Sequence, residues 1–110
     1  MATKLQIEDV TNVAENDDSL KERYKQVTGV DGKIEEVIPN PASVRGPFTY
    51  KTAIIIWLNS NIGTVKVFLG DTNVETWQTS PGGALKVIMV FLEPGYYSWW
   101  TNGAKVKFIR

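Results

Sequence analysis

The distribution of apolar and polar positions divides this chain into two unlike parts. The residues before Pro39 are mostly polar and acidic, whereas those from Thr49 onward are rich in β-branched and aromatic side chains. Short apolar runs separated by turn residues are typical of a β-sandwich. We therefore predict an all-β fold: a small antiparallel β-sandwich or jelly-roll-like domain over residues 46–110, preceded by a polar, partly helical or extended N-terminal arm over residues 1–45. Prolines between residues 39 and 47 favour an extended connector.

Two stretches of the second part are apolar on both faces of a predicted strand. Thr52 to Asn59 shows no alternation, and both alternating sets of Leu85 to Glu93 are apolar. One set is Ile88, Val90 and Leu92, and the other is Leu85, Val87, Met89 and Phe91. Such strands are covered on both sides, and so short a domain has little with which to cover them. We assign the first set, with Trp57 and Trp77, to the core or a subunit interface, and we expect self-association about a symmetry axis.

Turn residues predict a hairpin in the middle of the chain. Gly70-Asp71 joins residues 64–69 to residues 72–79, both of which are rich in β-branched side chains. The predicted cross-strand pairs are Val67 with Val74 and Lys66 with Glu75. A further short strand is predicted over Ile34–Ile38.

The end of the chain carries the strongest turn signal. Asn102-Gly103 stands between Tyr96–Thr101 and Ala104–Ile109 and favours a type I′ hairpin turn, which needs positive φ at both central residues. Alternation then predicts a core face of Tyr97, Trp99, Val106 and Phe108. The opposite face, called here the aromatic and basic face, consists of Tyr96, Ser98, Trp100, Lys105 and Lys107.

Two interpretations of the aromatic and basic face stay open. In the first, Tyr96 and Trp100 stack on sugar rings or bases, while Lys105 and Lys107 bind carboxylates or phosphates. The formal net charge of zero argues against nucleic acid, so a host-surface glycan is the better ligand. In the second, both aromatic rings lie in a subunit interface or beneath a loop, where tryptophan and tyrosine are enriched.

Residues 19–27 carry the helical signal of the first part. Leu20, Tyr24 and Val27 share one helix face. Asp17 or Asp18 is expected as the N-cap and Gly29 as the C-cap. Two interpretations are open here as well: a partly ordered arm with one or two helical turns, or a short coiled-coil seam that extends back to Val10.

Composition excludes most catalytic chemistry. Twelve basic residues balance twelve acidic ones, and the chain has neither cysteine nor histidine. This excludes disulfides, thiolate or imidazole metal sites, and Ser-His-Asp triads. Neighbouring carboxylates in Asp17-Asp18 and Glu35-Glu36 do not face each other, so neither pair suits glycoside hydrolysis. We expect no enzymatic activity, no metal and no cofactor.

Membrane and export signals are not found in this sequence. Its longest apolar runs are too short to span a bilayer as helices, and Met1–Lys4 lacks the apolar core of a signal peptide. We therefore expect a soluble protein made in a cytoplasm, without a membrane or nucleic-acid partner.

The segment from Val90 to Trp99 resembles a signature of tailed-bacteriophage proteins. Its apolar strand, Pro94-Gly95 turn and aromatic pair are similar to those of the small C-terminal β domains of phage fibres and virion-surface proteins, and the likeness covers residues 50–110. Glu93 departs from the pattern, because proline or a small residue is common there. Members of that group are typically homotrimers that decorate capsids, build fibre tips or bind host glycans.

The resemblance implies a homotrimeric bacteriophage virion structural protein, either a capsid decoration or a tail-fibre-type surface protein, without catalytic activity. It would be made in the host cytoplasm and located on the virion surface, with its arm bound to the major capsid protein or an adaptor. One alternative is a glycan-binding, host-receptor module that uses Tyr96 and Trp100. Another is a small adaptor of a non-viral assembly system that folds on its partner.

Overall fold

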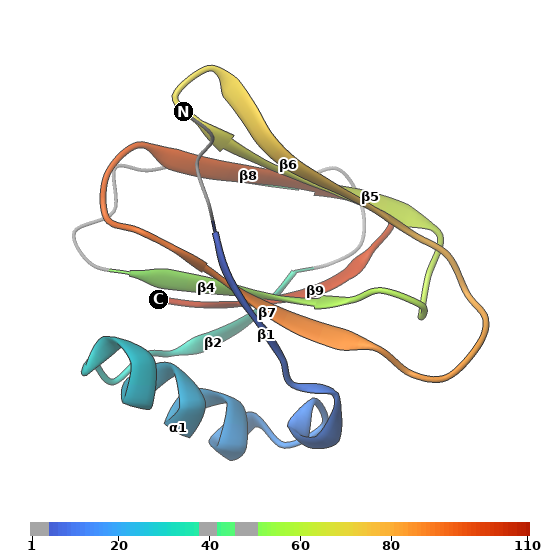
Figure 1. Ribbon diagram of the computed structural model, residues 1–110, viewed down its shortest axis with the longest axis horizontal. Helices are drawn as coiled ribbons and strands as arrows, with labels where there is room; N and C mark the ends of the chain where they lie inside the picture. The colour runs from blue at the N-terminus through green and yellow to red at the C-terminus, as the bar shows by residue number, and fades with distance from the viewer. Residues whose placement is uncertain (1–4, 38–41, 46–50) are drawn as a thin grey trace.

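Two antiparallel sheets stack face to face, and one helix lies on the outer side of the larger sheet (Figure 1). The computed structural model describes residues 5–37, 42–45 and 51–110. The chain is therefore the predicted all-β sandwich. The predicted connector at residues 39–47 falls largely outside the described residues.

Among the described residues, five strands form the larger sheet and four form the smaller sheet. The larger contains β1 (Gln6–Asp9), β7 (Val87–Leu92), β4 (Thr52–Trp57), β9 (Lys105–Ile109) and β2 (Ile34–Val37), in that spatial order. The smaller contains β3 (Ala42–Arg45), β8 (Tyr97–Asn102), β5 (Gly63–Leu69) and β6 (Thr72–Thr79), again in spatial order. A short 3-10 helix, η1 (Thr11–Val13), leads into α1 (Asp17–Thr28).

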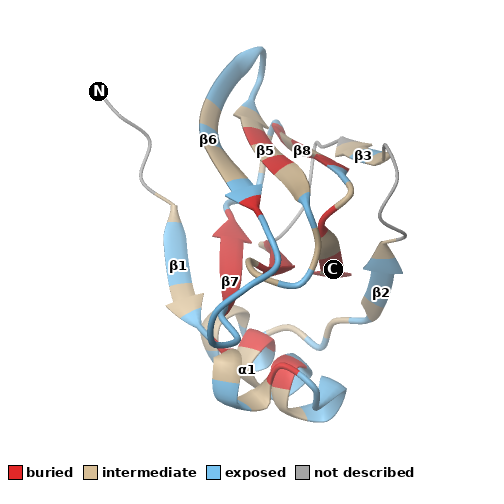
Figure 2. Ribbon diagram, turned by 90° about the vertical axis from the view of Figure 1, so that its right-hand side faces the viewer, coloured by how far each residue is buried: buried red, intermediate tan, exposed pale blue. Residues whose placement is uncertain are grey.

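The central strands β4 and β7 are buried along their whole length, as the apolar pattern predicted. Figure 2 shows this for β7, which is coloured as buried. Ile88, Val90 and Leu92 of β7 face the core between the two sheets. Of the alternate set, Val87, Met89 and Phe91 belong to a second cluster with residues of α1. The prediction is wrong for Leu85, which precedes β7 and is exposed. Each face of these strands is thus covered by a different layer of the same chain.

The N-terminal part of the chain does not form the separate arm predicted for residues 1–45. Strand β1 pairs with β7, β2 with β9, and β3 with β8, so this part adds strands to both sheets. Leu20 and Tyr24 of α1 are fully buried in one cluster with Met89. The Tyr24 hydroxyl also donates a hydrogen bond to the Lys51 carbonyl. The prediction failed because the few apolar residues that hold this segment are scattered among acidic ones.

Helix α1 is capped at both ends by side chain or backbone. Its N-cap is Asn16 and not the predicted Asp17 or Asp18: the Asn16 side chain accepts a hydrogen bond from the Ser19 N–H at 3.1 Å. The predicted C-cap is confirmed, since Gly29 has φ of 75° and closes the helix. The alternative of a coiled-coil seam is wrong, because the apolar face of α1 packs on the larger sheet.

A hydrogen-bond network joins the end of β1 to the start of β7. The Asp9 carboxylate accepts from the Thr11 hydroxyl at 2.6 Å and from the Thr11 N–H at 2.9 Å. The Val87 N–H donates to that same hydroxyl at 3.0 Å. These bonds from Thr11, helped by the nearby Lys86 ammonium, lower the pKa of Asp9 to about 2, so the network keeps its charged acceptor at neutral pH.

The hairpin of β5 and β6 forms around Gly70-Asp71 as predicted, but its strands pair in a different register from the predicted one. The predicted pairs, Val67 with Val74 and Lys66 with Glu75, are wrong because a β-bulge beside Val67 places it opposite Glu75. The Asn73 side-chain amide donates to the carbonyl oxygens of Val67 and Glu75, at 3.2 and 3.1 Å. A one-residue bulge of this kind leaves no clear trace in the apolar pattern.

The predicted C-terminal hairpin does not form. Strand β8 pairs with β3 and β5, whereas β9 pairs with β2 and β4, so Asn102-Gly103 carries the chain from one sheet to the other. Gly103 has the expected positive φ, 82°, but Asn102 does not, which excludes the type I′ turn. The predicted inward-facing residues are nonetheless all buried in the core between the sheets: Tyr97, Trp99, Val106 and Phe108.

Candidate functional site

The outer face of the four-stranded sheet is not covered by any of the described helices or strands (Figure 1). Its side chains are those that alternate with the buried residues of β5 and β8. They include Ser43 of β3, Lys66 and Phe68 of β5, and Ser98 and Trp100 of β8. Ser43, Trp100 and Lys66 stand opposite one another across three neighbouring strands, and Ser98 stands opposite Phe68.

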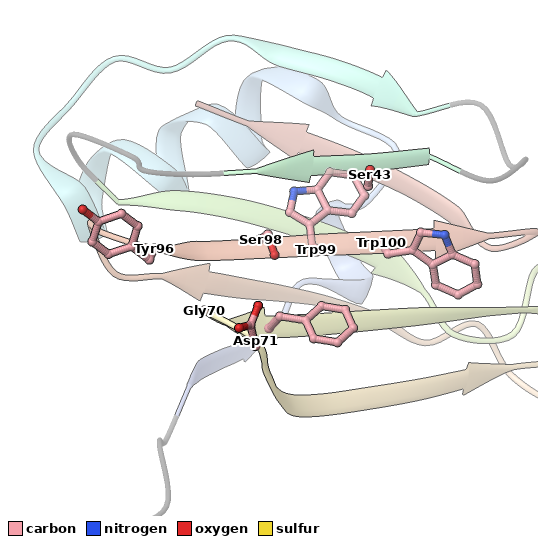
Figure 3. Close-up of a pocket in the computed structure, with 8 residues that line it drawn as sticks. Ser43, Gly70, Asp71, Tyr96, Ser98, Trp99 and Trp100 are labelled. Atoms are coloured by element: carbon pink, nitrogen blue, oxygen red, sulfur yellow. The ribbon is translucent and has the colours of Figure 1, made fainter.

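A hollow of about 500 Å³ lies on this face (Figure 3). It is lined by Ser43, Phe68, Gly70, Asp71, Tyr96, Ser98, Trp99 and Trp100. Tyr96 and Trp100 lie toward opposite ends of it and are four residues apart, which is about 13 Å along an extended chain. The volume is within the range of small-molecule sites.

Trp100 and Tyr96 differ in how deeply their side chains are buried. The Trp100 side chain is half-buried, whereas Tyr96 is 72 % exposed. The backbone beneath Tyr96 is fixed, because the Gly70 N–H donates to its carbonyl oxygen at 3.0 Å. The neighbouring Tyr97 points into the core, where burial, and then the Glu93 charge, raise the pKa of its hydroxyl. It therefore stays protonated at neutral pH and takes no part in the surface.

One cation and one anion accompany the aromatic rings. The Lys66 ammonium lies 5.7 Å from the centroid of the Trp100 ring, in cation–π range. Asp71 lines the hollow next to Gly70. Neither group belongs to any of the seven ion pairs found among the described residues. The surface therefore offers two charges that the described part of the protein does not neutralise.

The predicted aromatic and basic face is wrong as a single surface. Tyr96 and Trp100 line the hollow, but Lys105 and Lys107 belong to β9 in the other sheet. Their ammonium groups lie 4.7 and 5.7 Å from the centroid of the Trp57 ring, and Lys107 pairs with Asp17 at 2.7 Å. The lysines were assigned to the aromatic face only because β8 and β9 were expected to pair.

The remaining predicted site residues lie in the interior or beside it. Trp57, Ile88, Val90 and Leu92 are buried, and Trp77 is half-buried against the core between the sheets. Sequence reasoning missed Ser43, Phe68 and Asp71, since nothing local to them indicates a site. The one available signal was the alternation along β5. It places Lys66 and Phe68 on the outer face of the sheet, because the valines beside them in the strand are buried.

The acidic side chains of the described residues do not gather at the hollow. Asp71 is the single carboxylate among the residues that line the hollow. The predicted acidic neighbours are engaged elsewhere: Asp17 pairs with Lys107 and Glu35 with Arg110. Over the described ranges, no cluster of three or more acidic side chains is placed to hold a metal ion, and no helix is long and apolar enough to cross a membrane.

Comparisons with protein-family models, curated proteins and solved structures gave no match for this chain. The chemical groups of the surface are therefore what bears on the function. The aromatic rings, hydroxyl groups and single carboxylate of this surface are the chemical groups that bind a ligand with both apolar and hydroxylated faces.

Proposed function

We propose that this domain is a non-catalytic carbohydrate-binding module whose ligand lies in the hollow on the four-stranded sheet. The observation that carries this proposal is the pair Tyr96 and Trp100, which line the same hollow on an uncovered sheet face. Trp100 lies in β8, and Tyr96 comes just before that strand. Phe68 adds a third ring between them, since it stands opposite Ser98. These three rings, spread over β5, β8 and the residue before β8, give an elongated ligand successive surfaces on which to stack.

Carbohydrate fits this surface better than a purely apolar ligand does. A sugar ring has an apolar C–H face, which an aromatic ring covers, and a rim of hydroxyl groups that need hydrogen-bond partners. Ser43, Ser98 and Asp71 supply such partners along the same hollow. A wholly apolar ligand would leave these polar groups without partners at a cost in affinity.

Replacing Trp100 by alanine tests the proposal. Loss of one stacking ring is expected to weaken binding by about 1–3 kcal/mol, or about 5- to 150-fold. Binding is measured on an array of neutral and acidic oligosaccharides and then by calorimetry with the best ligand. Ile62→Ala is the control, since Ile62 is 76 % exposed but does not line the hollow. An array without ligands for the wild-type protein would contradict the proposal.

We further propose that the module is part of a homotrimeric bacteriophage virion protein, bound to a capsid or adaptor protein and displayed on the virion surface. The segment that resembles phage proteins, Val90 to Trp99, leads from β7 through the turn to Tyr96 at the hollow. Several large apolar side chains also remain exposed, including Ile7, Leu69 and Leu85. A second copy could cover them.

The oligomer part of this proposal is tested by the mass of the protein in solution. At micromolar concentration, sedimentation equilibrium is expected to give three times the 12.3 kDa of one chain. A mass of one chain over the whole concentration range would overturn the trimer, while the carbohydrate proposal would stand on its own array result.

A further inference from the structure

We infer that the ligand of the hollow is an acidic oligosaccharide that lies along β8 and places a carboxylate beside Lys66. This inference rests on the proposed carbohydrate function and adds the chemical class and the direction of the ligand. It follows from the two unpaired charges of the surface and from where each one stands relative to the three rings.

Lys66 is a cation held in place for a ligand. Its ammonium lies 5.7 Å from the centroid of the half-buried Trp100 ring. Five of the described lysines have carboxylate partners, among them Lys51 with Glu93 at 3.2 Å and Lys86 with Asp9 at 3.3 Å, whereas Lys33, Lys66 and Lys105 are in no ion pair. Of these three, Lys66 is the one that lies over a ring of the hollow. No carboxylate of the described residues pairs with Lys66. A carboxylate of a sugar stacked on Trp100 would provide that partner.

Asp71 sets the direction of the ligand. It follows Gly70, which is hydrogen-bonded to Tyr96, whereas Lys66 stands opposite Trp100. Lys66 and Asp71 are five residues apart in the chain, with Asp71 in the turn that follows the end of β5 at Leu69. A carboxylate is attracted to the Lys66 end and repelled from the Asp71 end, where hydroxyl groups are the favourable partners. The ligand is therefore longer than one sugar ring and carries its charge at the Trp100 end.

Single-stranded nucleic acid is the other polymer that binds to rows of aromatic rings. It would bring a phosphate at every nucleotide, including beside Asp71, whereas none of the described residues that line the hollow is basic and Lys66 lies over Trp100 alone. The formal net charge of the chain is also zero, so no long-range field attracts a polyanion. A sugar polymer with isolated carboxylates fits these charges better.

The test compares acidic sugars with neutral counterparts of the same length. The probes are a galacturonic acid trimer and sialyllactose, each beside a form whose carboxyl groups are reduced to alcohols, and a short oligothymidylate. At least one acidic probe is expected to bind tenfold or more tightly than its reduced form, because a charge-assisted hydrogen bond contributes about 1.5–3 kcal/mol. This preference is expected to fall as salt rises from 50 to 500 mM.

Lys66→Gln is expected to remove the preference, so that acidic and reduced probes bind within twofold of each other. Lys66→Arg is expected to retain it. The matched control is Lys105→Gln, which removes a lysine placed over Trp57 on the opposite sheet and is expected to leave binding unchanged. Unaltered melting temperature and circular dichroism would show that each variant folds.

The outcomes of this experiment distinguish an acidic ligand from carbohydrate binding in general. Equal binding of acidic and reduced probes by the wild-type protein, or an unchanged preference in Lys66→Gln, would overturn the acidic ligand and leave carbohydrate binding intact. No binding of any sugar would overturn both. Oligothymidylate that binds more tightly than either acidic sugar, and depends on Lys66, would replace the inference with nucleic-acid binding.

Discussion

Replacing Gly63 by alanine is expected to lower the free energy of unfolding by at least about 3 kcal/mol. A Cβ at Gly63 would lie 2.5 Å from both the Asn102 carbonyl oxygen and the Gly103 carbonyl carbon, and closer still to the Ala104 nitrogen. All of these atoms are backbone, so no side-chain rotation relieves the overlap, and the cost is at or beyond the upper end of that measured for overpacked cores. Urea unfolding followed by tryptophan fluorescence measures the change.

Gly83→Ala is the matched control for Gly63→Ala. Gly83 has φ of 70°, and a Cβ there would have no neighbour within 4 Å. Its replacement carries only the cost of the left-handed backbone, about 1–2 kcal/mol. Equal losses in the two variants would mean that the chain does not cross between the sheets against Gly63.

This crossing is the feature that local sequence signals could not predict. Asn102-Gly103 carries the residues of a tight hairpin turn, and the strands on both sides alternate as a hairpin would. The contact that local signals do not show is made by Gly63, about 40 positions earlier in the chain. Because Gly63 has no side chain, the backbone at Gly103 packs directly against it. With β4 and β5 already placed in different sheets, β9 pairs with the first and β8 with the second.

Other elements were predictable because their signals are local. The two apolar sets of β7, Ile88 to Leu92 and Val87 to Phe91, were assigned to opposite faces, and they do pack in different clusters. Gly70-Asp71 formed its hairpin because both strands flank it directly. Alternation along a single strand thus identifies its buried face and its exposed face, but it does not identify the strands with which it pairs.

The candidate site depends on which strands pair with one another, and it was therefore only partly predictable from the sequence. Tyr96 and Trp100 could be chosen as outward aromatic residues from one strand alone. Lys66 reaches Trp100 only through the pairing of β5 with β8, and Ser43 only through the pairing of β3 with β8. The lysines predicted for this site, which lie in β9, were placed by a pairing that does not occur.

Self-association was predicted from the expectation that a second copy covers the outer faces of β4 and β7. In the structure these faces pack against Leu20 and Tyr24 of α1, together with Val10 and Ala14. The chain supplies its own cover, so a homotrimer now depends on the exposed apolar residues and on the resemblance to phage proteins.

Replacing Leu20 by alanine is expected to lower the free energy of unfolding by about 3 kcal/mol, within the range for a fully buried leucine. Leu20 is 0 % exposed and lies in the cluster that joins α1 to Met89 and Phe91. Because this cluster is continuous with the larger sheet, the helix and the sandwich are expected to unfold together. Helical circular dichroism and tryptophan fluorescence should therefore give one coincident urea transition in the wild-type protein and the variant.

Leu85→Ala makes the same chemical change at a leucine that is 47 % exposed, and its expected cost is within about 0.5 kcal/mol of zero. The difference between the two leucines isolates the contribution of burial under α1. Suppose instead that the helical signal is lost at lower urea than the fluorescence, and that Leu20→Ala costs no more than Leu85→Ala. The first 30 residues would then be a detachable arm, as their polar composition suggested, and the apolar faces of β4 and β7 would again need a partner to cover them.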